Sequence, residues 1–115
     1  MEIKQYDVWI ADLNPQLGSE TGKTRPVIIV QTNLLNNVHL STIICPITTS
    51  IQPESEILRV HLNKGVANLK KNSDIMVDQL RTIDNRRLRE RIGKIPEEKI
   101  NELKENILAI LDLFE

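Results

Sequence analysis

The sequence Gly18-Ser19-Glu20-Thr21-Gly22-Lys23-Thr24-Arg25-Pro26 lies between two apolar runs, at residues 8–10 and 27–30. Both runs are typical of β-strands, so the stretch predicts a loop that leads into the second strand. Its two glycines permit positive φ. Its proline fixes one φ angle and favours an extended Arg25, which is therefore held at the start of a strand. A solvated hairpin loop is the alternative interpretation.

The stretch differs from the phosphate-binding loop of nucleotide-binding proteins. Residues 22–24 match the end of the pattern G-x-x-x-x-G-K-[ST], but three residues separate the two glycines where the pattern requires four. Arg25 and Pro26 also lead into a β-rich run, whereas the phosphate loop leads into a helix whose N-terminus binds phosphate. The sequence therefore argues against nucleotide binding here.

Length and composition indicate a single domain that spans residues 1–115. A chain of 115 residues can bury one apolar core, and 40% hydrophobic with 27% charged residues is ordinary for a globular protein. No apolar run approaches the roughly 20 residues that span a bilayer, and the N-terminus lacks the apolar segment of a signal peptide. We therefore expect a cytoplasmic protein that makes no membrane contact.

The chain contains one cysteine and two histidines. Cys45 cannot form an intramolecular disulfide, and its apolar neighbours predict a small buried side chain rather than a nucleophile. His39 and His61 belong to no cluster with the spacing of metal ligands. We therefore expect a reducing environment, no metal and no cofactor.

The charges are unevenly distributed although the net charge is only −1, because arginines are concentrated between residues 81 and 91. A local cluster of arginines of this kind can contact phosphates. Asp84 and Glu90 lie within it, however, so a solvated face with salt bridges is the favoured interpretation. Five of the seven arginines form the cluster: Arg81, Arg86, Arg87, Arg89 and Arg91.

The apolar pattern predicts a mainly β chain. Residues 27–30 are predicted to form a central strand that is buried on both faces. Pro46 should limit the pairing of a later strand on one side. Strands are predicted at residues 6–12, 27–30, 42–48, 56–62 and 73–80, with one or two short strands within residues 81–84 and 92–95.

Two of these strands carry polar residues of interest. In residues 56–62, alternation places Arg59 and His61 on one face, so His61 is interpreted as a polar residue on an exposed face. The other face takes Leu58, Val60 and Leu62.

In residues 73–80, alternation places Ile75, Val77 and Gln79 on one face and Met76, Asp78 and Leu80 on the other. Burying Asp78 or Gln79 without partners would cost a few kcal/mol each, so we expect partners or a ligand beside them.

The C-terminal residues predict one helix. Pro96 suits a first helical position, and the acidic residues 97–98 favour the positive end of the helix dipole. The predicted architecture is a small, strongly bent antiparallel sheet or partly open barrel closed by this helix. Its apolar stripe recurs at steps of three and four: Ile100, Leu103, Ile107, Ile110, Leu111 and Phe114.

Several blocks, in this order and in a chain of this length, resemble the MazF/PemK family of toxin endoribonucleases from type II toxin–antitoxin systems. Each block is weakly specific by itself, and together they extend over nearly the whole chain. They are Asp7-Val8-Trp9, Asp12-Leu13-Asn14-Pro15, residues 18–27, Pro46-Ile47-Thr48, residues 78–84 and Arg87-Leu88.

The resemblance implies a compact SH3-like barrel that works as a homodimer. It implies cleavage of single-stranded RNA, usually mRNA, at short sequences and without a metal, and inhibition by an acidic, MazE-like antitoxin. Arg25 and Thr48 match the catalytic arginine and threonine of the family. The reaction would be attack of the RNA 2′-OH on the adjacent phosphate, leaving a 2′,3′-cyclic phosphate and a 5′-OH.

The resemblance leaves the general base open between Asp78, which matches an aspartate of the PemK branch, and Glu20. That branch has an arginine where this chain has Met76 and a histidine where it has Ser19. The pair Arg25 and Thr48 is therefore the better supported catalytic set. RNA binding would involve Ser19, Glu20, Asp78, Gln79 and Arg81.

Two other interpretations remain. CcdB-like toxins share the fold, bind DNA gyrase and cut nothing, and this chain also ends in an apolar and aromatic segment, residues 113–115. Such a binder would not need Arg25 and Thr48. An inactive homologue that serves only as an interaction module is the third interpretation.

Overall fold

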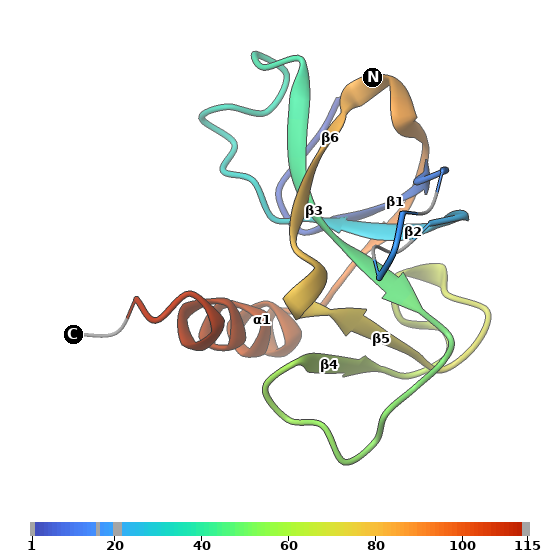
Figure 1. Cartoon of the computed structure of the whole chain (residues 1–115), viewed down its shortest axis with the longest axis vertical. Helices are drawn as coiled ribbons and strands as arrows, with labels where there is room; N and C mark the ends of the chain where they lie inside the picture. Colours follow the sequence, from blue (N-terminus) through green and yellow to red (C-terminus); the bar gives the residue numbers. More distant parts are fainter. Residues whose placement is uncertain (1, 16, 20–21, 114–115) are drawn as a thin grey trace.

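The computed structural model describes residues 2–15, 17–19 and 22–113. In that part of the chain, a strongly bent antiparallel sheet of seven strands is followed by one α-helix (Figure 1). Three short 3-10 turns, η1 (Val66–Asn68), η2 (Val77–Gln79) and η3 (Asn85–Arg87), lie between the later strands. The other elements are β1 (Asp7–Asp12), β2 (Thr24–Ile29), β3 (Ser41–Thr48), β4 (Arg59–Leu62), β5 (Ser73–Met76), β6 (Arg81–Asp84), β7 (Leu88–Lys94) and α1 (Glu97–Ile110).

Strand β3 connects the two halves of the sheet. It pairs with β2 along one side, while on its other side it pairs first with β6, at Ile44↔Arg81, and then with β5, at Thr48↔Asp74. The order β4-β5-β3-β2-β1-β7 ends in β4 and β7, and no pairing joins these two strands within the described residues. The sheet is therefore not a closed barrel, and the prediction of a bent, partly open sheet with one C-terminal helix is confirmed.

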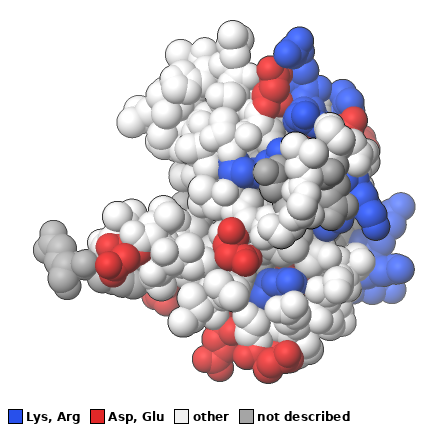
Figure 2. All heavy atoms as spheres, in the orientation of Figure 1, with Lys and Arg blue, Asp and Glu red and all other residues white. Residues whose placement is uncertain are grey.

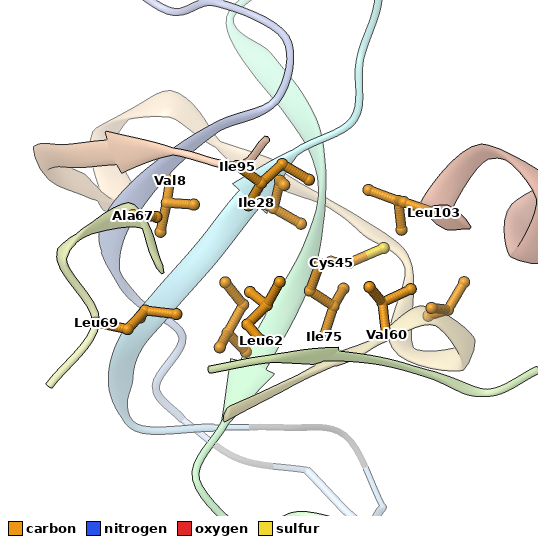
Figure 3. Close-up of a cluster of buried hydrophobic side chains, with 12 residues drawn as sticks. Val8, Ile28, Cys45, Val60, Leu62, Ala67, Leu69, Ile75, Ile95 and Leu103 are labelled. Carbon is orange, nitrogen blue, oxygen red and sulfur yellow. The ribbon is translucent and has the colours of Figure 1, made fainter. Parts of the chain in front are cut away.

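Two apolar clusters cover the two faces of the central strands. Ile28 belongs to the first cluster and its neighbours Val27 and Ile29 to the second, as the alternation of a strand requires. The predicted burial of this segment on both faces is confirmed for these residues, and Val30 is half-buried. The first cluster, drawn in Figure 3, includes Val8, Ile28, Cys45, Val60, Leu62, Ile75 and Leu103; the second includes Trp9, Ala11, Leu13, Val27, Ile29, Ile44 and Ile83.

Helix α1 packs on the first cluster as predicted. Leu103 is fully buried, and Ile100, Ile107 and Ile110 pack against the same cluster. The extended Pro96 precedes the helix as its N-cap residue, and the acidic residues follow in its first turn. Leu111 lies just beyond the helix and is exposed, so its predicted place in the stripe is wrong; Phe114 lies outside the described residues.

The predicted strand 56–62 is shorter than expected. It begins only at Arg59, which pairs with Met76, the last residue of β5, so β4 has no partner strand for earlier residues. Leu58, which was predicted to share the buried face of Val60, is exposed. Its carbonyl accepts a hydrogen bond from the backbone N–H of Val77 instead.

The predicted strand 73–80 ends at Met76, and η2 follows. Strand β3 changes partner here, and its residues Cys45 and Pro46 pair with β2 but with neither β5 nor β6. Limited pairing on one side was expected of Pro46, which has no N–H to donate. Asp78 and Gln79 therefore lie in a turn, Asp78 exposed and Gln79 half-buried, so the predicted alternation and burial cost of these two residues are wrong.

Cys45 is the small buried side chain that the sequence predicted. It is free and fully buried in the first cluster, and burial, with the nearby charge of Asp78, raises the pKa of its thiol to about 12. No helix in the described part of the chain is long and apolar enough to cross a membrane. Among the same residues, no group of three or more His, Cys, Asp or Glu side chains is arranged to hold a metal ion.

Candidate active site

The loop between β1 and β2 is closed at its base by hydrogen bonds. The backbone N–H of Leu13 donates to the carbonyl of Lys23 at 2.9 Å, and the N–H of Lys23 donates to Asn14 Oδ1 at 2.9 Å. Arg87 Nη1 donates to the carbonyl oxygens of Asp12 and Asn14 from the far end of the chain. These contacts fix the direction in which the chain enters β2.

Arg25 lies at the start of β2, where it pairs with Ala11 of β1. Its Nε donates to the carbonyl of Gly22 at 2.9 Å, and the side chain is half-buried. Burial lowers the pKa of the guanidinium, which starts from such a high value that the group remains charged near neutral pH. Among the described residues no carboxylate forms an ion pair with Arg25. Its two Nη groups therefore offer donors for an external anion.

Thr48 is the last residue of β3, and β3 pairs with β2, the strand that carries Arg25. The register of β2 with β3 ends at Val27↔Pro46, and continuing it by two residues on each strand brings Arg25 opposite Thr48. Residues opposite each other in an antiparallel pair project from the same face. The Thr48 Oγ1 accepts a hydrogen bond from the backbone N–H of Ser50 at 3.1 Å, so its own proton can be donated elsewhere.

Three other predicted site residues, Asp78, Gln79 and Arg81, lie beside the opposite edge of β3. Asp78 and Gln79 lie in η2, beside the part of β3 that neither β5 nor β6 pairs with, and Arg81 begins β6 opposite Ile44. Ser19 is exposed in the loop before β2, and Glu20 lies outside the described residues. Arg25 and Thr48 thus lie at adjoining ends of the paired strands β2 and β3. Asp78 and Gln79 in η2, and Arg81 at the start of β6, adjoin β3 on its other edge.

The arginines of the 81–91 segment are largely paired within the protein. Arg86 donates to both carboxylate oxygens of Asp84, at 3.0 and 3.1 Å. Arg89 pairs with Asp12, and Arg91 pairs with Asp7. On the face of the molecule that it draws, Figure 2 shows lysines and arginines gathered on one side, with acidic side chains near the helix and at one end. The prediction of a salt-bridged face is therefore confirmed.

Sequence reasoning missed a polar cluster next to Thr48. Asp74, which pairs with Thr48 in the sheet, is fully buried and accepts hydrogen bonds from Arg59 and His61. The interpretation of His61 as a merely exposed polar residue is therefore wrong, because its ring is bonded on both sides. A possible signal was the acidic residue 74 within an apolar run, together with two basic residues that alternate on the preceding strand.

A pocket of about 430 Å³ also opens beside Thr48. Apolar side chains, including Ile10 and Ile92, form much of its lining, and Lys70 and Lys71 contribute positive charge. The pocket combines an apolar surface with cations next to Thr48, an arrangement that suits a base and a phosphate of a nucleic acid.

Comparison with known proteins places the chain in a family. A sequence model described as "PemK-like, MazF-like toxin of type II toxin-antitoxin system" matches residues 4–111. Endoribonuclease EndoA of Bacillus subtilis is 34% identical over 115 residues, which cover 97% of this chain and 99% of that protein.

Solved structures show the same fold. MazF of Deinococcus radiodurans superposes with a TM-score of 0.83 at 20% identity and covers 97% of this chain and 98% of its own. A MazE-MazF structure from the same organism gives a TM-score of 0.78 at 20% identity and covers 99% of both chains. With an extended family match and a relative above 30% identity, the chain belongs to the PemK-like, MazF-like toxins of type II toxin–antitoxin systems.

Proposed function

We propose that this toxin is an endoribonuclease that cuts single-stranded RNA, with mRNA as its cellular target. The observation that carries the proposal is the position of Arg25 and Thr48 at adjoining ends of the paired strands β2 and β3, with the guanidinium Nη groups and the hydroxyl proton available. The 34% identity to a protein named an endoribonuclease supports the same activity. The family match gives no support to the gyrase-binding alternative.

Arg25 and Thr48 act on the charge that develops during cleavage. Attack of the RNA 2′-OH on the adjacent phosphorus creates a negatively charged phosphorane and leaves a 2′,3′-cyclic phosphate and a 5′-OH. Arg25 binds two of the phosphorane oxygens through its planar fork of donors, and Thr48 donates one further hydrogen bond. Removing one such donor typically costs about 10²–10³ in rate. This reaction requires no metal.

A general base must accept the proton of the 2′-OH, and two carboxylates are candidates. Asp78 is exposed in η2 beside Pro46, and two residues along a strand span roughly 7 Å, which separates Pro46 from Thr48. Glu20 belongs to the loop before Arg25. Single-turnover rates for Asp78→Asn and Glu20→Gln assign the role: the variant of the true base loses most of its rate, and the other variant keeps it.

RNA binding is assigned to side chains around this strand end. Gln79 can read base edges with its amide, and the carboxylates of Asp78 and Glu20 suit amino donors such as cytosine N4. Ser19 and Arg81 complete the set, with Arg81 suited to a phosphate. Trp9 is buried in the second cluster, so it offers no surface on which a base could stack.

Partners are proposed on the same grounds. A Deinococcus relative of the same fold was solved as a MazE-MazF structure, so we assign this toxin a MazE-like antitoxin. A single protomer of this size offers little surface for an RNA groove, and a homodimer would extend it. Light scattering at micromolar concentration tests the dimer, and a monomer would exclude it. The cytoplasm, where mRNA is found, is the proposed location.

The deciding experiment incubates the purified protein with a long RNA in excess EDTA and maps the new ends. Cyclic phosphate and 5′-OH termini support the proposed reaction. Cleavage that requires a divalent metal overturns the metal-independent mechanism. Intact RNA, with or without metal, overturns the endoribonuclease assignment, and a parallel gyrase assay then tests the CcdB-like alternative.

A further inference from the structure

The carboxylate of Asp74 has no exposed surface, and it accepts hydrogen bonds from three donors. Its Oδ2 accepts from the backbone N–H of Gln52 at 2.8 Å and from Arg59 Nη1 at 3.0 Å, and its Oδ1 faces His61 Nδ1 at 2.6 Å. Burying a carboxylate is costly unless its oxygens are satisfied by donors and a counter-charge. The three donors meet that requirement, and we call Asp74, Arg59 and His61 the Asp74 cluster.

The cluster is joined to Thr48 by the sheet and by a chain of hydrogen bonds. Asp74 is the strand partner of Thr48. Arg59 Nη1 donates not only to Asp74 but also to the carbonyl of Ser50 at 3.1 Å, and the N–H of Ser50 donates to the Thr48 hydroxyl at 3.1 Å. With the Gln52 bond, the segment from Thr48 to Gln52 is held at alternate residues. Only one of these contacts, the Ser50 N–H bond to the Thr48 hydroxyl, involves the proposed catalytic pair.

His61 adds a contact that depends on its charge. Its Nδ1 meets a carboxylate and its Nε2 meets the carbonyl of Ser55 at 2.9 Å, and both partners can only accept. Both ring nitrogens must therefore carry a proton, which defines the imidazolium. Loss of one proton removes one of the two bonds. The charged groups around the ring are Arg59 on β4, Asp74 on β5 and Glu102 on α1.

We propose that Asp74 is a positioning residue for RNA cleavage, acting through Arg59 and His61 to hold the segment from Thr48 to Ser55 in its reactive geometry. The inference rests on the proposed function, because it assigns Thr48 a direct role in the reaction. Asp74 does not touch the RNA; it keeps the Thr48 hydroxyl bonded to Ser50 so that the hydroxyl proton points outward. A misplacement of about 1 Å in such a group can cost about 10² in rate.

The chain offers a matched control at Asp84. The Asp84 carboxylate also accepts hydrogen bonds from a backbone N–H and from a guanidinium, both of which belong to Arg86. Unlike Asp74, it is exposed, and it lies at the far end of β6. Asp84→Asn keeps a good capping side chain for η3. Asp74→Asn and Asp84→Asn thus remove the same charge from two similar clusters, only one of which is joined to Thr48.

The first test compares single-turnover and steady-state cleavage of one RNA by the two variants. For Asp74→Asn we expect a kcat lower by about 10²-fold and a KM within about 3-fold of wild type. Asp84→Asn should match wild type. An unchanged kcat in Asp74→Asn, or a loss confined to KM, overturns the positioning role.

A pH profile separates positioning from general stability. The wild-type kcat should fall at alkaline pH as the His61 ring, followed by NMR, loses its proton. In His61→Gln this dependence should be absent and kcat uniformly low. If Asp74→Asn does not fold, His61→Gln still tests the proposal, because the buried Asp74 carboxylate then keeps its two other donors, Gln52 and Arg59. If kcat of His61→Gln depends on pH in the same way as kcat of wild type, the proposal is overturned.

A third readout does not need RNA cleavage. The amide hydrogens of Ser50 and Gln52 are bonded to Thr48 Oγ1 and Asp74 Oδ2, so their exchange with solvent should be slow in wild type and faster in His61→Gln and Asp74→Asn than in Asp84→Asn. If wild type leaves RNA intact, the proposed function fails while this measurement still tests the cluster. Equal exchange in all variants overturns the proposal even when the RNA is cut.

Discussion

Arg25 and Thr48 stand on neighbouring strands, two residues beyond the last pair that joins β2 to β3, Val27↔Pro46. The strands separate at this point because the loop before β2 closes on itself, with Arg25 Nε bonded to Gly22. A guanidinium and a hydroxyl thus lie at adjoining strand ends, beyond the apolar second cluster that packs on β1, β2 and β3. The rigid sheet positions both groups, while the open end leaves room for a polymer.

Arg25→Ala should leave a folded protein that no longer cuts RNA, because the side chain is half-buried at a strand end and not part of either apolar cluster. Arg25→Lys should also be badly impaired, since an ammonium cannot reproduce the two parallel hydrogen bonds of the guanidinium. Cleavage rates and far-UV circular dichroism check both statements. Wild-type activity in the alanine variant would remove Arg25 from the mechanism.

Thr48→Ser should keep much of the activity, and Thr48→Val should lose about 10²–10³ in rate, because the hydroxyl and not the side-chain volume contributes the hydrogen bond. Valine is close to threonine in shape, and serine can still accept the bond from the Ser50 N–H. The measurement is single-turnover cleavage with saturating enzyme. Equal rates for valine and serine would show that Thr48 is only a strand residue.

The elements could be predicted where the local pattern was sufficient. Apolar alternation identified most of the strands, and the stripe through Leu103 identified the helix. The end of β5 at Met76 could not be predicted, because it depends on β3 exchanging β6 for β5 beside Pro46. That exchange is a property of the whole sheet, and it moved Asp78 from a strand into a turn.

The site was predictable to a similar extent. The GSETGKTRP stretch pointed to Arg25 before any pairing was known, and the resemblance to the toxin family pointed to Thr48. The Asp74 cluster was missed because it requires β4 to pair with β5 in one register, in which His61 lies opposite Asp74. No single segment of sequence contains that information.

The pH dependence of stability should follow the Asp74 cluster. The hydrogen bond that His61 donates to Asp74 raises the pKa of His61. The stabilising effect of protonated His61 is therefore complete below its ordinary pKa of about 6.5 and is lost as pH rises through the raised value. Burial alone would raise the pKa of Asp74, but its hydrogen bonds from Gln52 and His61 lower it overall. That contribution is present above about pH 3.9 and is lost as pH falls through the lowered value.

Urea unfolding of wild type and His61→Gln at about pH 5.5 and about pH 9 measures this effect. The free energy of unfolding of wild type should exceed that of the variant at the lower pH, and the difference should shrink at the higher pH. A difference that is the same at both values would show that the charge of His61 does not contribute.

Gly93→Ala should lower the free energy of unfolding by about 1–3 kcal/mol, because a Cβ at this buried position of β7 would lie 2.8 Å from the backbone C, Cα and O atoms of Ala67. Ala67 itself has a positive φ of 52°, so the turn it belongs to has little freedom to move away. Chemical denaturation tests the value, with Lys94→Ala at the exposed neighbouring position as the control. A variant as stable as wild type would mean that η1 can shift at no cost.

The exposed charges bear on how the proposed MazE-like antitoxin would inhibit this protein. Most arginines of the 81–91 segment have acidic partners on the protein itself, whereas Arg25 has none among the described residues. Lys70 and Lys71 lie in the pocket beside Thr48. An inhibitor that blocks the site would therefore meet positive charge from Arg25 and these lysines rather than from the paired arginines.

We expect the MazE-like partner to inhibit through an acidic segment that competes with RNA for this surface, because both ligands need the same cations. Its affinity should fall as salt is raised, since screening weakens attraction between exposed charges. The test titrates an RNA complex of the slow-cutting Thr48→Val variant, which keeps Arg25, with the protein encoded next to this one. Lys70→Glu with Lys71→Glu should weaken both RNA and partner, whereas Asp84→Asn should weaken neither. A partner that binds tightly without displacing RNA, or whose affinity is independent of salt, would show that inhibition acts from another surface.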